Sequence, residues 1–372
     1  MRSVRTLVLA TLGCALVASS ASAQQDEKLS IHGYLTQGYA VSDSALMIGI
    51  PKTGTTDYRR AALLLRYSQS DRDNFVIQMA HRRLGESPSM QFESDVKVDW
   101  AFYEHQFGTQ TRLRVGKMPI QFGIYNEIRY VGTQIPFYRA PYAFYHEGIY
   151  TSETVDGLTV SQSLLGETAF PIEANAYAGS FSFLDFQTVP VPGPTGPVLV
   201  YQGQRVRAQS ALGGSLWIST PIEGLRIGGG GQRYTVPNAF FVARKTSFDG
   251  YNAGLDAKFE RFYLRSEFRH VDAKKILQYD GWYSQGGVAV TSKISLGAQA
   301  ERATYHVRTT TSNYRVPLVH DDAVVLSYSV SPNLVVKTEA HATKGFNVEG
   351  VTNTRGTPLE GRYFISSLSV AF

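Results

Sequence analysis

The last eleven residues of the chain alternate between two kinds of side chain. They read R-Y-F-I-S-S-L-S-V-A-F. Counting back from Phe372 to Phe364, every second residue is apolar except Ser366, whereas Ser367, Ser369 and Ala371 between them are polar or small. A period of two with one apolar register is typical of a β-strand that meets an apolar medium on one face and a wetter one on the other.

A strand that ends on a carboxy-terminal Phe resembles the closing strand of bacterial outer-membrane barrels. That resemblance implies a bilayer outside the barrel and, if the barrel is large, water inside it. The mean hydropathy of −0.16 is that of a soluble protein, yet 12% of the residues are aromatic and 22 are Tyr. A barrel reconciles these values, because half of each strand faces lipid and half faces water, and Tyr suits the two membrane interfaces.

Residues 1–23 have the order of a secretory signal peptide. Two arginines precede the apolar residues 7–18, and Ala21-Ser22-Ala23 follows, which predicts cleavage after Ala23. The apolar run is too short for a membrane anchor. Cleavage there removes Cys14, the one cysteine, so we expect no disulfide. The 36 lysines and arginines, less the two in this segment, exceed the 31 acidic residues by three, which is no nucleic-acid signature.

Five internal segments also alternate with a period of two, which predicts strands rather than helices. They are residues 58–68, 74–82, 97–105, 261–270 and 293–301. In residues 97–105 we place Trp100 and Phe102 on the apolar face, and Asp99 and Tyr103 on the polar face.

The links between strands are alternately short and long. The short turns are predicted at residues 70–74, 108–111, 155–158, 221–224, 259–261, 291–293 and 331–333. The longer links are predicted at residues 41–57, 85–95, 118–146, 166–204, 236–249, 307–321 and 343–361. Tight periplasmic turns and long outer loops have this asymmetry.

The chain is therefore predicted to be all-β: a transmembrane antiparallel β-barrel of about 16 strands over residues 24–372, in one domain. Residues 172–183 also alternate, and we place them as a hairpin arm within the long outer loop 166–204, to keep the strand number even. A soluble β-sandwich or a secreted β-rich enzyme is the alternative fold. A barrel of this size is wide enough for an aqueous channel.

Residues 114–148 are the most distinctive internal segment. They begin as a strand and continue as a loop with four aromatic residues within 137–144. An exposed loop of this composition would be an unusual apolar patch. Folded into the lumen, residues 118–146 would act as a constriction loop and bring Glu127, Arg129 and Arg139 to the narrowest point. The alternative is a loop that caps the barrel or packs against a neighbouring subunit.

This segment resembles the phosphate-selective and related substrate-selective porins of Gram-negative outer membranes. The resemblance lies in Gly116, Lys117, Pro119, Gly123, Arg129, Pro136, Pro141 and Tyr145, and in the opening Ile31-His32-Gly33-Tyr34. It implies a sixteen-stranded, trimeric diffusion channel with an inward-folded third loop. The dense lysine cluster of a dedicated phosphate channel is not recognisable in this sequence, so the resemblance does not carry phosphate specificity.

Arginines recur on the predicted inward register. With the loop residues above, the predicted pore-lining set is Arg60, Arg66, Arg82, Arg114, Glu127, Arg129, Arg139, Arg265 and Arg269. Fixed positive charge in a narrow pore concentrates anions, and a guanidinium matches carboxylate, sulfate or phosphate. We therefore predict a passive porin for small hydrophilic solutes with a weak anion preference. In the alternative, Asp99, Glu104, Glu127 and Glu267 neutralise the arginines in a wall network.

Other functional classes find less support in the sequence. His320-Asp321-Asp322 is the best hydrolase candidate, but successive strand residues point to opposite faces and cannot converge on one atom. The eight histidines show no paired metal spacing, so we expect no enzyme, metal or cofactor. An adhesin or structural barrel remains an alternative. The expected partners are outer-membrane lipid and lipopolysaccharide, small solutes and two further copies of the chain, and not nucleic acid.

Overall fold

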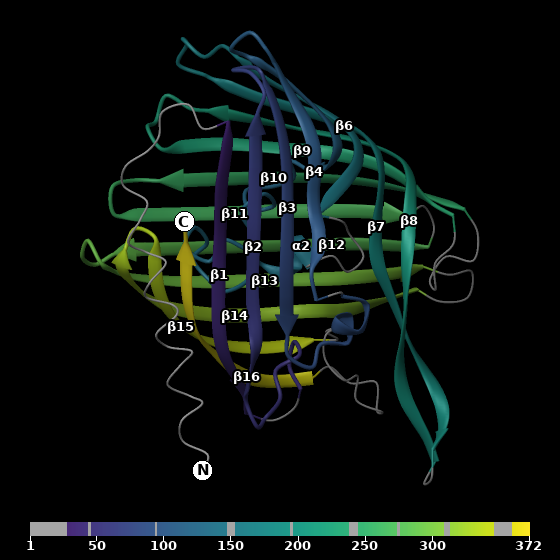
Figure 1. The fold of residues 1–372 in the computed structure, drawn as a ribbon. Coiled ribbons are helices and arrows are strands. Elements are labelled where there is room, and N and C mark those ends of the chain that lie inside the picture. Colours follow the sequence, from purple (N-terminus) through teal and green to yellow (C-terminus); the bar gives the residue numbers. More distant parts are fainter. Residues whose placement is uncertain are drawn as a thin grey trace, which may run out of the picture.

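The structure is a computed structural model that describes residues 28–43, 46–93, 95–146, 153–193, 196–237, 245–273, 276–308, 313–345 and 359–372. The predicted signal peptide lies outside the described residues. The described chain forms a closed antiparallel barrel of sixteen strands, which confirms the predicted fold class (Figure 1). The first half of the wall is β1 (Leu29–Ser42), β2 (Thr55–Ser68), β3 (Asp73–Leu84), β4 (Lys97–Phe107), β5 (Thr111–Pro119), β6 (Thr154–Leu164), β7 (Ile172–Gly193) and β8 (Gly196–Ser219).

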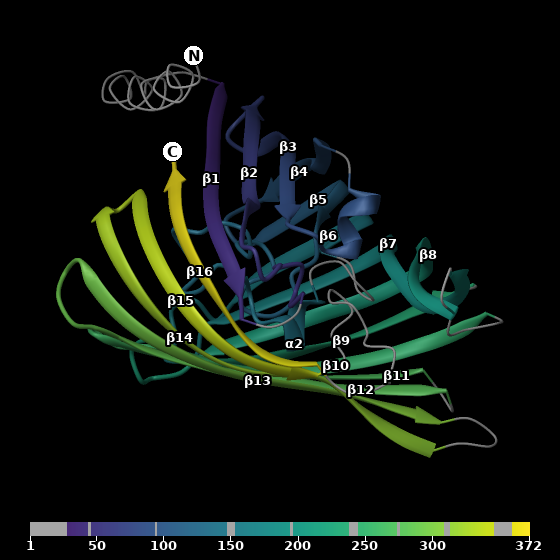
Figure 2. The ribbon, with the colours of Figure 1, turned by 90° about the horizontal axis from the view of Figure 1, so that it is seen from below.

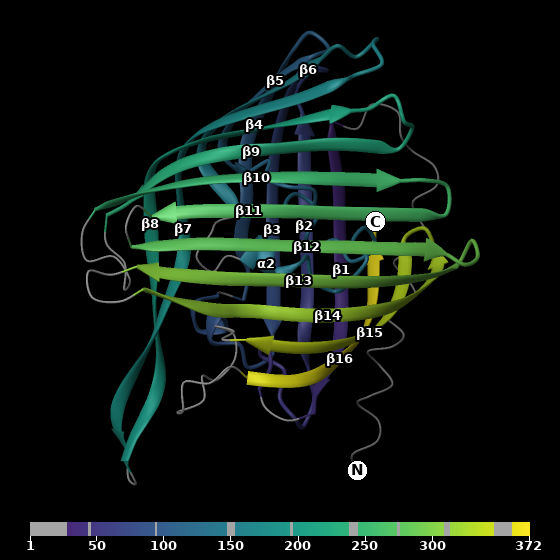
Figure 3. The ribbon, with the colours of Figure 1, turned by 180° about the vertical axis from the view of Figure 1, so that it is seen from behind.

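The second half of the wall, seen face-on in Figure 3, is continuous from β9 to β16. Its strands are β9 (Leu225–Val236), β10 (Thr246–Lys258), β11 (Phe262–Ala273), β12 (Leu277–Ala289), β13 (Ile294–Arg308), β14 (Asn313–Ser331), β15 (Leu334–Gly345) and β16 (Leu359–Ala371). Two short helices lie outside the wall strands in sequence, η1 (Pro88–Phe92) and α2 (Tyr142–Tyr145). None of the helices in the described part of the chain is long and apolar enough to cross a membrane.

The carboxy-terminal strand closes the barrel as its alternation predicts. β16 pairs with β1, and the backbones of Gly33 and Phe372 exchange hydrogen bonds of 2.9 and 3.0 Å. Leu368 is exposed on the outer face, whereas Ser369 is buried and accepts a hydrogen bond of 3.0 Å from Thr36. The two registers of the sequence are therefore the two faces of the wall.

The prediction for residues 172–183 is wrong, because they belong to a wall strand. β7 pairs with β6 from Ile172 to Ser180 and with β8 along its whole length. The short turn on this side is residues 165–171, where Leu165 has a φ of 54°. The predicted turn at 155–158 lies instead inside β6. Beyond Ser180, β7 pairs only with β8, and this hairpin projects past the rest of the barrel (Figure 1).

A β-bulge also corrects the predicted faces of β4. Gln78 pairs with Trp100 while the next residue of β3, Met79, pairs with Val98, so Asp99 is the extra residue. A bulge shifts the alternation by one position. Phe102 is consequently buried inside the barrel, and Tyr103 lies on the outer face, where its ring is 5.2 Å from that of the exposed Phe75.

Candidate functional site

Residues 120–146 leave the wall after β5 and make contact with strands all around the barrel. Figure 2, which shows the barrel from below, places α2 of this segment among the surrounding strands, as Figure 1 does. We refer to residues 120–146 as the inner segment. One apolar cluster joins it to the wall, with Tyr125, Phe144 and Tyr145 of the segment packed against Tyr283 of β12.

Glu267 on β11 binds the inner segment at two points and the neighbouring strand β12 at a third. Its carboxylate accepts hydrogen bonds from the backbone N–H of Ile124 at 3.0 Å, from the Tyr145 hydroxyl at 2.5 Å and from the Tyr283 hydroxyl at 2.6 Å. Gly123 lies beside this carboxylate with a φ of +65°. A Cβ there would lie 2.6 Å from the Tyr145 hydroxyl and 2.7 Å from Glu267 Oε1, so the turn requires glycine.

Three charged residues on β13 and β15 bind backbone groups farther along the inner segment. Glu301 accepts a hydrogen bond of 2.7 Å from Ala143 N–H, and Glu339 accepts one of 2.6 Å from Tyr138 N–H. The Lys337 ammonium donates to the carbonyl of Ile135 at 2.5 Å. Side chains of the wall thus take the place of the water that would otherwise bind these backbone groups.

Four of the predicted pore-lining arginines are buried against the inner segment, two on the wall and two within the segment. Arg60 on β2 donates to the Tyr138 carbonyl at 2.8 Å, and Arg269 on β11 donates to the Phe144 carbonyl at 3.0 Å. Arg129 donates to the Tyr145 carbonyl at 3.0 Å. The fourth buried arginine is Arg139, whose guanidinium lies 3.4 Å from the Tyr58 hydroxyl.

Three more of the predicted arginines form ion pairs. The closest N–O distances are 2.7 Å for Arg82 with Glu93, 2.8 Å for Arg114 with Glu104, and 2.9 Å for Arg265 with Asp256. Arg114 also pairs with Glu127 at 3.2 Å. Arg66 and Glu127 are the two members of the predicted set that the structure leaves exposed.

Two ionisable groups in the loops have shifted pKa values. Burial acts to raise the pKa of Glu93, but the charges of Arg82 and Lys97 outweigh it and lower the pKa to about 2. Burial lowers the pKa of His146 well below its usual value, and the charges of Arg269 and Arg129 add to this effect. Glu93 is therefore ionised and His146 neutral at pH 7.

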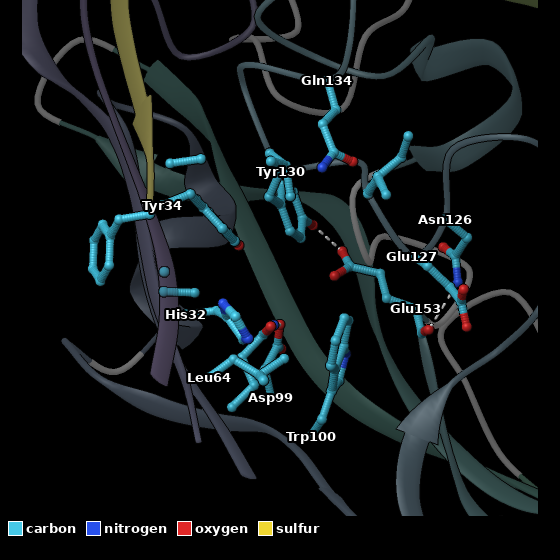
Figure 4. Close-up of a pocket in the computed structure, with 17 residues that line it drawn as sticks. His32, Tyr34, Leu64, Asp99, Trp100, Asn126, Glu127, Tyr130, Gln134 and Glu153 are labelled. Carbon is cyan, nitrogen blue, oxygen red and sulfur yellow. Dashed lines mark hydrogen bonds between the residues drawn. The ribbon is translucent and has the colours of Figure 1, made fainter. Parts of the chain in front are cut away.

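A cavity of about 320 Å³ lies between the inner segment and strands β1–β4 (Figure 4). The wall contributes Tyr34, Asp99 and Trp100 to its lining, and the other side contributes Glu127, Tyr130 and Glu153, among others. The Tyr130 hydroxyl donates a short hydrogen bond to Glu153 and accepts one of 2.6 Å from Arg82. The carboxylates in its lining and its place inside the barrel make this cavity the candidate site for a solute.

Some residues of this site escaped the sequence analysis. Glu153, Glu93 and Asp256 carry no local pattern that marks them. Lys337 and Glu339 do carry such a pattern, because they alternate with Val336 and Thr338 over residues 335–343.

The hydrolase candidate is split between the two faces of β14. Asp321 is buried and 2.8 Å from Nδ1 of His341, whereas the exposed Asp322 pairs with Arg302 at 3.0 Å. Within the described ranges, no group of three or more His, Cys, Asp or Glu side chains could hold a metal ion.

The barrel is similar to solved outer-membrane proteins. OmpF of Salmonella typhi, in complex with daunomycin, has a TM-score of 0.61 and 8% identity over 92% of this chain and 97% of its own. OmpT of Vibrio cholerae has a TM-score of 0.60 and 10% identity over 94% of this chain and 100% of its own. A trimer form of OmpT has a TM-score of 0.58 and 11% identity over 92% of this chain and 99% of its own. An anion-selective porin from Comamonas acidovorans has a TM-score of 0.55 and 10% identity over 92% of this chain and 99% of its own.

These similarities show a porin-like barrel fold. No protein-family model matches the sequence, and no curated protein matches it.

Proposed function

We propose that this chain is an outer-membrane porin through which small hydrophilic solutes diffuse passively. The observation that supports this most is a closed barrel of sixteen strands with an apolar outer face and a polar interior that holds a cavity. A barrel of this strand number leaves space for water. The porins and channels among its structural neighbours support the same function.

The inner segment is the proposed constriction. Hydrogen bonds to β11, β13 and β15 anchor it to that part of the wall, and the 320 Å³ cavity lies between it and strands β1–β4, beside the hydrogen bond from Arg60 to the Tyr138 carbonyl. Solutes would therefore pass between the inner segment and strands β1–β4. The anchoring groups are buried, so the constriction is fixed rather than gated by a free loop.

The predicted anion preference depends on arginine charge that reaches the solute. The ion pairs of Arg82, Arg114 and Arg265 favour the alternative raised by the sequence, a wall network in which carboxylates offset these charges. We propose a pore of weak ion preference, set by the exposed Arg66 and Glu127 and by the acidic cavity.

The proposed location is the outer membrane, with the apolar outer face in contact with lipid and lipopolysaccharide. The proposed assembly is a homotrimer, supported by the trimer form of the Vibrio cholerae neighbour.

Liposome swelling tests the proposed function. Liposomes that contain the purified barrel should admit small sugars faster than large ones, because the passage beside the inner segment excludes large solutes. Protein that inserts but causes no swelling with any sugar would overturn the porin function and favour an adhesin or structural barrel. A potassium chloride gradient across a planar bilayer gives the ion preference from the reversal potential.

A further inference from the structure

We infer that the cavity between the inner segment and β1–β4 binds a small organic cation, an ammonium group attached to an apolar body. The inference rests on the proposed porin function, because the solute reaches the cavity through the lumen. Three carboxylates line the cavity, those of Asp99, Glu127 and Glu153, and the lining contains no Lys or Arg among the described residues. His32 is its one basic side chain.

Asp99 is the carboxylate that a cation would meet. The bulge in β4 turns it into the cavity, where it is only 6% exposed. Its hydrogen bond is from a neutral group, the Gln78 amide at 3.2 Å. In the described part of the chain, no Lys, Arg or His nitrogen lies within ion-pair distance of Asp99. A buried carboxylate without a cationic partner is costly, and a bound ammonium group would supply that partner.

The other two carboxylates already have partners. Glu127 pairs with Arg114 at 3.2 Å, and Glu153 lies 3.5 Å from Arg82 and accepts the hydrogen bond from Tyr130. They add negative charge to the cavity without competing for the same ligand atom. Asp99 therefore fixes the position of the ammonium group.

Aromatic and aliphatic side chains complete the site. Figure 4 shows Tyr34, Trp100 and Leu64 around the same space as Asp99. The face of an aromatic ring attracts an ammonium ion, Trp most strongly. Ile128 and Val131 of the inner segment add apolar surface. This combination fits an organic cation better than a hydrated metal ion.

A second cavity, of about 240 Å³, makes the assignment specific to the first. Its lining also includes Asp99 and Glu153, with two further carboxylates, Glu93 and Asp156. There, however, the four carboxylates are matched by four basic side chains, Arg82, Lys97, Lys117 and Arg205. Asp99 lies where the two cavities meet. A cation is thus favoured on the β1–β4 side of Asp99, whereas on the other side basic side chains already balance the carboxylates.

Block of the ionic current tests the site. The intact protein is placed in a planar bilayer in sodium chloride at pH 7.5, with benzyltrimethylammonium as the probe and benzenesulfonate as its counterpart of opposite charge. The cation should reduce the current at concentrations at which the sulfonate does not. Asp99→Asn should weaken the block about tenfold or more, because it removes a charged partner and keeps the shape.

Two further variants make the result decisive. Trp100→Leu should weaken the block severalfold, because it removes an aromatic face from the site, and it tests the site if Asp99→Asn does not fold. Asp322→Asn, the same charge change at an exposed position on β14, should leave the block unchanged. Equal block by benzenesulfonate, or a block that neither cavity variant alters, would overturn the cation site while leaving a conducting porin. Inserted wild-type protein that passes no current would overturn the porin function and the site together.

Discussion

The two sides of the lumen meet the inner segment in different ways. On the filled side, formed by β11, β12, β13 and β15, charged wall residues bind its backbone directly, as Glu267 and Glu339 do. On the open side, formed by β1–β4, a cavity of about 320 Å³ separates much of the wall from the segment. The comparison teaches that several inward charges bound to backbone N–H and C=O groups fill the lumen on one side, whereas on the other side the hydrogen bond from Arg60 to the Tyr138 carbonyl leaves space for solute beside it.

The largest expected effect on stability comes from Glu267→Leu, which removes an anchor of the inner segment on the filled side. Three donors would lose their acceptor in a buried setting, so we expect a loss of about 4 kcal/mol in the free energy of unfolding. Urea unfolding in detergent micelles measures it. Glu173→Leu, at a carboxylate with a 68% exposed side chain, is the control and should change stability by less than about 0.5 kcal/mol. Equal losses in the two variants would contradict the anchoring role.

The second largest effect on stability is expected from protonation of Glu93, at the edge of the open side. The pKa of Glu93 is lowered to about 2, so its ion pairs with Arg82 and Lys97 stabilise the folded state fully above pH ~5 and lose that effect as the pH falls towards 2. The contribution is about 3 kcal/mol by linkage.

The unfolding free energy of the wild type relative to Glu93→Gln measures this contribution. The advantage of the wild type should be constant from pH 7 to 5 and shrink below that. An advantage that persists unchanged at pH 2.5 would show that the charge of Glu93 is not its source.

Gly123→Ala tests the close contact on the filled side. Its Cβ would meet the Tyr145 hydroxyl and Glu267 at 2.6 and 2.7 Å, in addition to the strain of a φ of +65°. We expect a loss of about 2 kcal/mol. Gly108→Ala is the matched control, since Gly108 has a φ of +63° but no atom within 4 Å of the added Cβ, and should cost about 1 kcal/mol. Identical costs would show that backbone strain alone decides the residue.

The smallest effect is expected for Arg66→Gln. This exposed arginine on β2 should change stability by less than about 0.5 kcal/mol and shift the reversal potential towards cation preference. Arg60→Gln on the same strand should instead destabilise the fold, since Arg60 is buried and donates to the Tyr138 carbonyl. An unchanged reversal potential for Arg66→Gln would mean that its charge does not reach the pathway.

The wall was largely predictable from the sequence, because alternation reports directly which face of a strand meets lipid. β16, β11 and β13 follow their predicted registers, with Ser369, Glu267 and Gln299 buried on the inner side. β4 departs from its predicted alternation because a bulge inserts one extra residue, Asp99. No residue type in the sequence marks the position of this bulge. β7 was placed in a loop to keep the strand number even, because a turn was predicted at residues 155–158, which lie inside β6.

The interior was less predictable, because its partners are far apart in the sequence. Tyr138 and Glu339 are separated by 201 residues, and Ala143 and Glu301 by 158. Alternation indicates that Glu301 faces inward, but not whether it meets water or the backbone of a loop. The predicted arginine ring shows the same limit, since Arg60 and Arg269 do face inward but bind loop carbonyls.

Single-channel conductance of the wild type and of a variant in which residues 121–145 are replaced by a short Gly-Ser link is the most direct test of an open passage beside the inner segment. The proposed porin predicts stable steps proportional to voltage for the wild type and markedly larger steps for the variant, whose barrel keeps its β5–β6 pairing. Folded wild-type protein that gives no steps, or a variant with steps of unchanged size, would contradict it.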